Sequence, residues 1–355
     1  VKRPGVLRLW SWQSVAHGAD AVLYFQMRAS RGACEKYHGA VLDHAGRTDT
    51  RAFREVAALG ADFERVGGAI LGARTPARVA MLFDWDSWWA SEITDGLNRT
   101  VTYPQVVLGY HRALWEAGVQ LDVVAVDAPL DGYDVVVAPL LHLLKGDVEN
   151  RLRAVVERGG SVLSTFLSGR VDEDTNAFLA DAPGPLAPMF GVRVEETDSL
   201  PAESVNRISL TGAGLEGVVD SRSVFEILVP EGAEVVGSYG DDFYAGRAAV
   251  TRMASAAGGS AWYVGALLDP DGVRAVVRAV LAEHDLIGPY ADEPELEFAV
   301  REGQGGRFAF LLNHSDAPVS VAAHAAGTDL ITGDSIRRGD ALTLEPKGVL
   351  VLRES

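Results

Sequence analysis

The sequence predicts an α/β protein in three parts, and three observations support this prediction. Residues 1–72 show a helix–strand–helix pattern, residues 73–287 alternate short apolar strands with helices, and residues 288–355 carry only short strands separated by Gly, Asn and Asp turns. A chain of 355 residues also exceeds what one ordinary core supports. We therefore expect a short α/β segment, a larger α/β domain and a small antiparallel β-sandwich.

Two helices and one strand are predicted in the first part. Apolar positions in 6–17 recur at helical spacing until Gly18, and 21–27 is a continuous apolar run of a length typical of a strand buried on both faces. A second helix is expected over 50–66. Its apolar stripe consists of Phe53, Val56, Leu59 and Phe63.

The second part alternates strands and helices at a regular rhythm. The predicted strands are 78–83, 121–126, 133–138 and 161–166, and the predicted helices are 103–117 and 147–158. Such alternation is typical of an open parallel sheet with right-handed crossovers. We therefore expect residues 78–285 to form one α/β domain.

Composition disfavours several classes of partner. A formal net charge of −17 disfavours nucleic acid, since binding to phosphates depends on a basic surface. Cys34 is the only cysteine, so no intrachain disulfide is expected and a cytoplasmic location fits best. The sequence has neither an apolar run long enough for a membrane span nor a leader peptide, so we expect no membrane partner.

The helix-like and strand-like patterns that follow Val1 directly resemble the middle of a domain, so we expect further residues before Val1.

The α/β domain offers no recognisable catalytic motif. Its first strand, 78–83, is followed by DWDSWWASE rather than a glycine-rich phosphate loop, and neither a Walker motif nor a Gly-x-Ser-x-Gly elbow is found. An amidotransferase needs a thiolate in the strand-to-helix turn, and Cys34 lies outside the domain. We expect a structural or interfacial role, in which Trp85, Trp88 and Trp89 form a contact patch or instead cap the core of their own domain.

The candidate functional residues lie in VLYFQMRASRGACEKYHG, residues 22–39. In an α/β barrel, functional side chains lie at the carboxyl ends of strands and on the following loops, and this segment has that layout. Glu35 and His38 would share one side of a helical turn and could bind vicinal hydroxyls. One other interpretation remains open, in which Glu35 forms a surface ion pair with Arg28 or Arg31 and His38 is only solvated.

Metal binding is not predicted. One Glu-x-x-His motif in a loop lacks the second motif and the further glutamates of carboxylate-bridged metal proteins. His17 and His44 have no partners at ligand spacing, so we expect them to serve the core or the surface.

The stretch KRPGVLRLWSWQSVAHGADAVLYFQMRASRGACEKYHGAVLDHAG, residues 2–46, resembles the last barrel segment of glycoside hydrolase family 42, the β-galactosidases with a (β/α)8 catalytic domain. The segments FREVAALGADF, VAMLFDWDSWWASE, YHRALWEAGVQLDVV and YDVVVAPLL are similar to the helix that leaves that barrel and to the α/β trimerisation domain of the family. The resemblance implies the terminal segment of a TIM barrel, a flavodoxin- or amidotransferase-like trimerisation domain, and a C-terminal β domain.

The resemblance also implies roles for particular residues. Phe25, Glu35 and His38 match positions that contact galactose, with Glu35 accepting hydrogen bonds from sugar hydroxyls. Met27 stands where the family usually has Trp, so a flexible thioether replaces a rigid ring. Neither catalytic glutamate of the family matches a residue here, and both are expected before Val1.

The resemblance therefore implies part of a retaining β-galactosidase that acts in carbohydrate metabolism as a homotrimer on terminal β-D-galactosides, without a cofactor. The alternative is a non-catalytic assembly or carbohydrate-binding protein that retains this part of the family.

Overall fold

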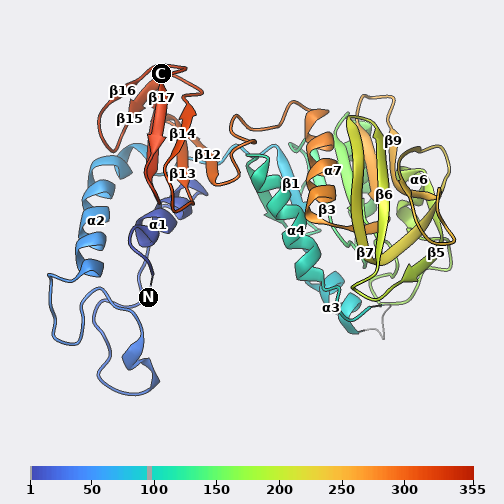
Figure 1. Cartoon of the computed structure of the whole chain (residues 1–355), viewed down its shortest axis with the longest axis horizontal. Helices are drawn as coiled ribbons and strands as arrows, with labels where there is room; N and C mark the ends of the chain where they lie inside the picture. The colour runs from blue at the N-terminus through green and yellow to red at the C-terminus, as the bar shows by residue number, and fades with distance from the viewer. Residues whose placement is uncertain (1, 94–97) are drawn as a thin grey trace. The chain divides into compact units, whose positions relative to one another are not determined.

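The computed structural model describes residues 2–93 and 98–355, which form two compact units (Figure 1). We name Ala77–Ile287 the central unit. The discontinuous unit combines Val1–Pro76 with Gly288–Ser355. None of the helices in the described ranges has both the length and the apolar character that crossing a bilayer requires.

An 11-stranded mixed sheet organises the central unit. Its parallel half has the order β2-β1-β3-β4-β10, comprising β1 (Val79–Leu82), β2 (Leu121–Val124), β3 (Val135–Ala138), β4 (Ser161–Thr165) and β10 (Ser260–Val264). Its antiparallel half comprises β5 (Val192–Ser199), β6 (Val205–Gly212), β7 (Leu215–Pro230), β8 (Glu234–Tyr239), β9 (Ala248–Ala254) and β11 (Ala266–Leu268).

The prediction of an open parallel sheet over 78–285 is therefore wrong for the second half of the unit. The chain between residues 192 and 254 reverses direction through short turns, as between Gly212 and Leu215, and a strand that returns through a short turn must pair antiparallel. The coarser prediction of an α/β domain is confirmed.

Helices cover both faces of this sheet. On one face lie α4 (Tyr103–Glu116) and α7 (Pro270–Ala282), and on the other α5 (Val148–Glu157) and α6 (Ala187–Phe190), which follows the short turn η2 (Gly184–Leu186). Alternate residues of β3 enter different cores, Val137 towards α4 and α7 and Val136 towards α5 and α6. Burial on both faces explains why these strands read as continuous apolar runs.

The discontinuous unit contains two small antiparallel sheets, as predicted for this part of the chain. The first has the order β12-β13-β18-β15-β16 and the second pairs β14 with β17. The strands are β12 (Leu296–Gly303), β13 (Gly306–Asn313), β14 (Val319–Ala322), β15 (Gly327–Asp329), β16 (Ser335–Ile336), β17 (Ala341–Leu344) and β18 (Val349–Glu354).

The larger of these sheets is buried on both faces. Phe308, Phe310 and Leu312 of β13 pack on helices α1 (Val6–Ala16) and α2 (Arg51–Ile70). The intervening Ala309 and Leu311 join the core shared with β14 and β17. The two helices therefore form one layer over a sheet that comes from the other end of the chain (Figure 1).

Both helices predicted in the first part are confirmed. α1 ends at Ala16, and α2 begins after Thr50, whose Oγ1 accepts a hydrogen bond from the N–H of Phe53 at 3.2 Å and so caps the helix. α2 continues to Ile70, beyond the predicted end at Val66, because Val66 and Ile70 both remain buried against the sheet.

The strand predicted over 21–27 is wrong for this structure. These residues have no regular secondary structure, and only Arg28 forms an isolated bridge, with Leu42. A strand needs neighbours that pair with its N–H and C=O groups, and the described residues supply no strand beside this segment. Its apolar side chains are consequently exposed, Leu23 by 91% and Phe25 by 71%.

A buried carboxylate on β12 joins the sheet to α1. Glu297 accepts hydrogen bonds from Nε2 of His17 at 2.5 Å, Nε2 of His314 at 2.6 Å and Nε2 of Gln13 at 2.8 Å. Burial raises the pKa of Glu297, but the hydrogen bonds from His17 and His314 outweigh that effect and lower it from an ordinary value of 4.5 to about 2. His17 thus takes part in a structural hydrogen bond, in line with the role expected for it.

The pKa of Glu297 predicts acid sensitivity. A carboxyl group whose pKa falls on folding stabilises the fold fully above its unfolded pKa of about 4.5, and this stabilisation is lost as the pH falls towards 2. The shift corresponds to about 3 kcal/mol at the upper end of this window. Urea unfolding measured from pH 5 to pH 2 should show a smaller loss of unfolding free energy in Glu297→Gln than in the wild type. The exposed control Glu302→Gln should follow the wild type, and equal losses in all three proteins would contradict the prediction.

Candidate functional site

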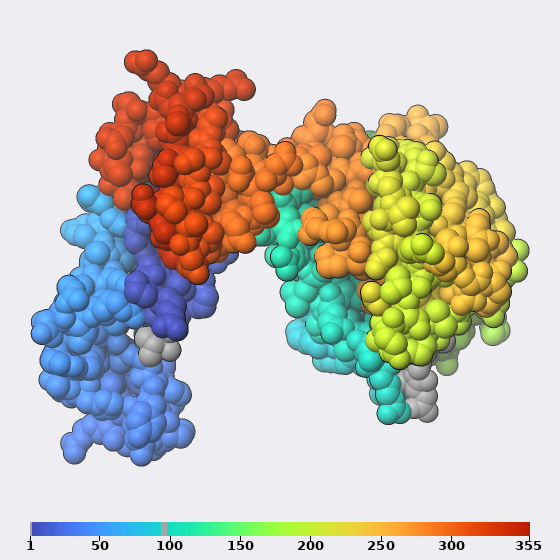
Figure 2. Space-filling model, viewed as in Figure 1, coloured from blue at the N-terminus to red at the C-terminus, as the bar shows by residue number. Residues whose placement is uncertain are grey.

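The segment between α1 and α2 is a long loop that extends from the helices away from the C-terminal strands (Figures 1 and 2). Backbone hydrogen bonds fasten its two arms together. The N–H of Val41 donates to the carbonyl of Gln26 at 3.0 Å, and the N–H of Leu42 donates to the carbonyl of Met27 at 2.8 Å. His44 Nε2 lies 2.9 Å from the carbonyl of Ser30, so His44 serves the loop itself.

A cavity of about 510 Å³ lies between this loop and the first turns of α1 and α2. Phe25 and His38 both line it, and their rings meet edge to face with centroids 6.2 Å apart. The complete lining is Lys2, Leu7, Tyr24, Phe25, Gln26, Tyr37, His38, Gly39, Ala40, Val41, Arg51, Ala52, Glu55 and Val56. An apolar ring beside polar groups is the kind of surface that suits a sugar.

Glu35 does not line this cavity. It lies in the single helical turn η1 (Cys34–Tyr37), and the N–H of His38 donates to its carbonyl at 2.9 Å. Within the described residues its carboxylate forms no ion pair with Arg28 or Arg31, the alternative that the sequence left open. The structure therefore brings together two of the three predicted site residues, Phe25 and His38.

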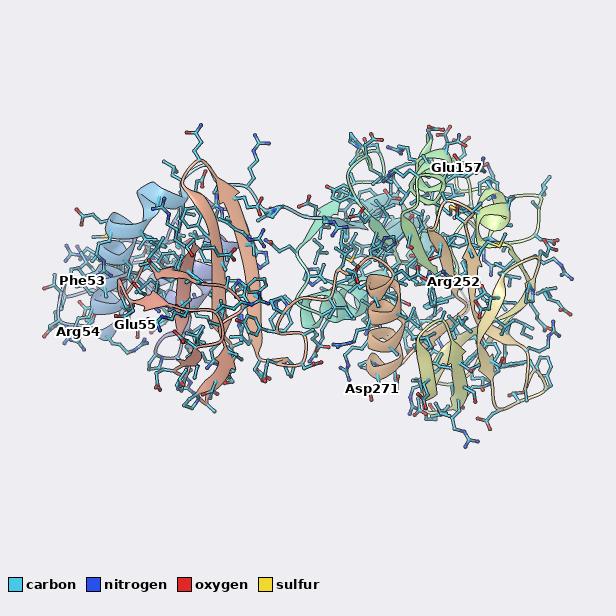
Figure 3. All side chains as sticks on the ribbon, turned by 90° about the horizontal axis from the view of Figure 1, so that it is seen from above. Phe53, Arg54, Glu55, Glu157, Arg252 and Asp271 are labelled. Carbon is cyan, nitrogen blue, oxygen red and sulfur yellow. The ribbon has the colours of Figure 1, made fainter. Side chains whose placement is uncertain are left out.

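Sequence reasoning missed a charged pair in the cavity wall. Arg51 Nη1 donates to Glu55 Oε1 at 2.8 Å, and the N–H of Gly5 lies 3.4 Å from the same oxygen. Glu55 is labelled on α2 in Figure 3. The available signal was the i,i+4 spacing of Arg51 and Glu55, which places both on one face of the predicted helix, next to the loop.

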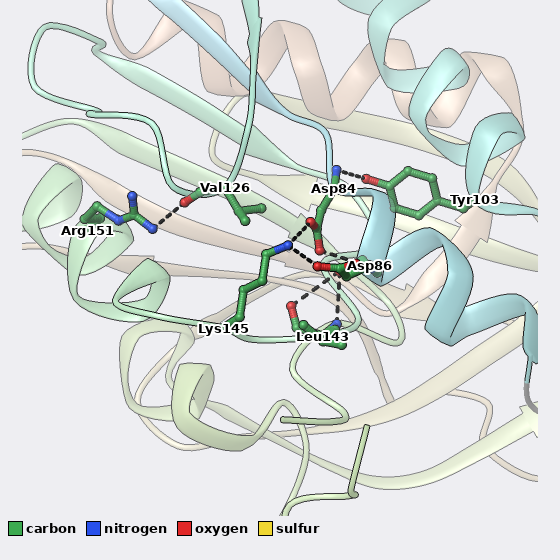
Figure 4. A network of polar contacts seen from close by, with 8 residues as sticks. Asp84, Asp86, Tyr103, Val126, Leu143, Lys145 and Arg151 are labelled. Carbon is green, nitrogen blue, oxygen red and sulfur yellow. Dashed lines mark hydrogen bonds and ion pairs between the residues drawn. The ribbon is translucent and has the colours of Figure 1, made fainter. Parts of the chain in front are cut away.

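The carboxyl ends of the parallel strands in the central unit are occupied by internal contacts (Figure 4). Lys145 Nζ lies 2.7 Å from Oδ1 of the buried Asp84 and also pairs with Asp86. Burial lowers the pKa of Lys145, but hydrogen bonds to Asp84 and Asp86 outweigh it, so the pKa is raised and the ammonium stays charged. The N–H of Asp84 also donates to the Tyr103 hydroxyl at 2.8 Å, and burial raises the pKa of Tyr103 to about 12.

The strained position in the turn after β4 carries an apolar residue, and the nearby Ser168 hydroxyl is bonded to Ser164 and to the N–H of Leu141. Leu167 occupies this position in the left-handed region with φ 57°, and its N–H donates to the buried carboxylate of Glu226 at 3.0 Å. Glu226 also pairs with Arg170 and accepts a hydrogen bond from the Tyr263 hydroxyl at 2.8 Å. Among the described residues, no group of three or more His, Cys, Asp and Glu side chains could hold a metal ion.

The three tryptophans of the predicted contact patch differ in their burial. Trp88 stacks on Tyr103 with centroids 6.0 Å apart and packs on the core of its own unit. Trp85 and Trp89 are 54% and 60% exposed, and both lie on α3 (Trp85–Ile93) at helical spacing with the exposed Ile93. We name Trp85, Trp89 and Ile93 the α3 stripe.

The fold and the cavity define a multidomain α/β protein with features suited to binding a small polar ligand. Family models match it over three ranges: "Beta-galactosidase" over residues 1–66, "Beta-galactosidase trimerisation domain" over 77–287 and "Beta-galactosidase C-terminal domain" over 295–354. The chain belongs to glycoside hydrolase family 42, so the resemblance seen in the sequence is confirmed.

Individual relatives agree. The chain is similar to β-galactosidase BgaA of Planococcus sp. (strain 'SOS Orange'), 39% identical, and to β-galactosidase BglY of Alicyclobacillus acidocaldarius, 41% identical, with 99% of this chain and 52% of the relative aligned in both cases. It is also similar to the crystal structure of β-galactosidase from Bacillus circulans sp. alkalophilus, with a TM-score of 0.94, 36% identity, and coverage of 100% of this chain and 52% of the other. The chain thus spans about half the length of these relatives.

Proposed function

We propose that this chain is the C-terminal portion of a retaining β-galactosidase that hydrolyses terminal β-D-galactosides. The observation that carries the proposal is the cavity beside Phe25 and His38, which lies within residues 1–66, the range that matches the family model named "Beta-galactosidase". In this proposal residues 1–72 are the closing part of a TIM barrel. The described residues include no strand beside 21–27, as an incomplete barrel would produce.

The loop would supply part of a galactose subsite. The ring of Phe25 would pack on the apolar face of the sugar, and His38 would donate or accept one hydrogen bond. Glu35 lies outside the lining of the cavity, and its proposed role, to accept hydrogen bonds from sugar hydroxyls, rests on its match to the family position. These bonds accelerate hydrolysis only as far as they strengthen in the oxocarbenium-like transition state. Met27 is exposed, so it leaves a flexible group where the family usually has a flat ring.

The catalytic carboxyl groups would come from the part of the protein that this chain does not include. A retaining glycosidase uses two carboxyl groups about 5–5.5 Å apart, one as nucleophile and one as acid and base. Glu35 would hold the substrate while those groups form and hydrolyse the glycosyl-enzyme intermediate.

Residues 73–287 would assemble the protein as a homotrimer. The match of 77–287 to the family model for a trimerisation domain supports this, and the exposed α3 stripe offers an apolar contact surface. The strand order of the parallel half matches the flavodoxin-like order, which supports the proposed fold type of this domain.

Residues 288–355 would be a C-terminal β-sandwich. The single cysteine supports a cytoplasmic location for the protein.

Activity should require more than this chain. The polypeptide of residues 1–355 should release no nitrophenol from a nitrophenyl β-galactoside. A longer protein that also contains a counterpart of the part of BgaA that this chain does not cover should release it. Turnover by the shorter protein, free of contaminating enzyme, would contradict the proposed division of the site. An inactive longer protein would favour the non-catalytic alternative, an assembly or carbohydrate-binding protein.

Removing the Glu35 carboxylate should weaken transition-state binding. In the active longer protein, Glu35→Ala should lower kcat/KM roughly 10- to 150-fold, the range expected when a charged hydrogen bond worth about 1.5–3 kcal/mol is lost. Glu35→Gln should lose less, since the amide oxygen still accepts one hydrogen bond. Glu64→Ala removes an exposed carboxylate from α2 and serves as the control. Equal kinetics in all variants would reject the sugar contact.

The α3 stripe should govern assembly. The double variant Trp85→Ser, Trp89→Ser should raise the protein concentration at which half of the trimer has dissociated by at least about tenfold. The reason is that exposed aromatic side chains contribute strongly to interfaces. Light scattering coupled to size-exclusion chromatography measures this shift. Leu179→Ser removes another exposed apolar side chain of the same unit and should leave the assembly unchanged. A trimeric wild type with an equally stable double variant would place the interface elsewhere.

A further inference from the structure

A second polar side chain on β12 reaches the loop that carries the cavity. Arg301 lies on the same face of the strand as Glu297 and is only 1% exposed. Its guanidinium donates to the carbonyl of Val15 at 3.0 Å and to the carbonyl of Ala19 at 3.1 Å, and it pairs with the Asp20 carboxylate at 2.8 Å.

Arg301 also fixes the other end of the helical layer. Its Nε donates to the carbonyl of Ala73 at 3.1 Å, just after α2, and the N–H of Gly72 lies 3.3 Å from Oδ1 of Asp20. One guanidinium therefore joins the end of α1, the start of the loop and the end of α2. The planar fork of five N–H donors makes this possible, and the shorter-reaching donors of a Lys ammonium could not satisfy all these acceptors.

The first residues of the loop have few hydrogen-bonded restraints, although the half-buried Val22 packs on the apolar core of this unit. Within the part of the chain that the structure describes, no hydrogen bond holds residues 21–23. The next restraint is the Tyr24 hydroxyl, which lies 2.6 Å from Oγ of Ser11 on α1. Phe25 follows immediately and lines the cavity. The chain that leads to Phe25 is thus held at Asp20 by Arg301 and at Tyr24 by Ser11. The chain that follows Phe25 is held by the hydrogen bond from the N–H of Val41 to the carbonyl of Gln26.

We propose that Arg301 is a positioning residue for the galactoside subsite and acts on Phe25 through Asp20. The inference rests on the proposed function and extends it by giving the C-terminal β domain a part in substrate binding. A displacement of about 1 Å at a binding group is enough to lower the rate of an enzyme substantially, and a pair formed across the sheet–helix contact prevents such displacement. Hydrogen bonding to Arg301 lowers the pKa of Asp20, which keeps the pair charged.

Two variants separate positioning from folding. Arg301→Lys keeps the charge and loses the fork, but it leaves buried carbonyls without donors and so lowers stability. Asp20→Ala breaks the same link from the partly exposed side and disturbs the core less. Arg338→Met removes an exposed arginine from the same unit and is the control.

Each variant is made in the active longer protein, and its melting temperature is measured first. Then kcat, KM and the inhibition constant of galactose are measured at an assay temperature well below all of these melting temperatures. Both Asp20→Ala and Arg301→Lys should raise KM and the inhibition constant of galactose by about tenfold, with a smaller change in kcat. Asp20→Glu, which can still pair with Arg301, should recover most of the loss.

Two results would overturn the inference alone. One is a wild type that is active while Asp20→Ala and Arg301→Lys both match the kinetics of Arg338→Met. The other is a loss confined to the amount of folded protein, with KM and the inhibition constant unchanged. A longer wild-type protein without activity would instead overturn the proposed function, and the positioning role would fall with it.

Discussion

The two faces of strand β12 determine how the discontinuous unit is held together. On the face towards α1 and α2, Ala299 lies between Glu297 and Arg301. On the opposite face, Leu296 and Val300 join the core shared with β14 and β17. Because side chains alternate along a strand, a shift of one residue would bury the polar pair among apolar groups and expose the apolar set. The register of β12 against β13 therefore also aligns α1, and with α1 the start of the loop that bears Phe25.

The buried charged side chains Glu297 and Arg301 of this unit each have several partners. Arg301 and Glu297 are each bonded by three or more groups, from segments far apart in the chain. Burying a charge without such partners costs several kcal/mol. The central unit follows the same rule at Glu226, where Arg170, Tyr263 and the N–H of Leu167 meet one carboxylate. In both units the polar clusters fix one arrangement of elements that apolar packing alone would leave less specific.

Local pattern predicted the elements that depend on local chemistry. Helices α1 and α2 and strands β1 to β4 were visible because their apolar spacing matches a period that burial imposes, whereas β10 of the parallel half was not predicted. The strand over 21–27 was wrongly predicted, because an apolar run gives no information on whether neighbouring strands are present to pair with it. The antiparallel half of the central sheet was missed for a related reason, since the direction of pairing depends on the turns rather than on the strands.

The sequence also indicated some residues of the candidate site and missed others. Phe25, Glu35 and His38 were named from their place after an apolar run and from the family resemblance; Phe25 and His38 lie in contact in the cavity wall, whereas Glu35 does not line the cavity. Arg51 and Glu55 were missed because helical spacing says which face they share but not what that face adjoins. The bond between Gln13 and Glu297 spans 284 positions and has no local signature at all.

That separation has a consequence for biosynthesis. The core of the discontinuous unit contains Leu9 and Trp12 near one end of the chain and Val351 near the other, with the whole central unit translated between them. On the ribosome, the faces of α1 and α2 that pack on β13 and β18 therefore stay uncovered until these strands emerge, whereas the central unit can fold from contiguous sequence as soon as residue 287 has left the exit tunnel. Such late closure of long-range contacts slows folding and makes the nascent chain a substrate for chaperones that shield apolar surface.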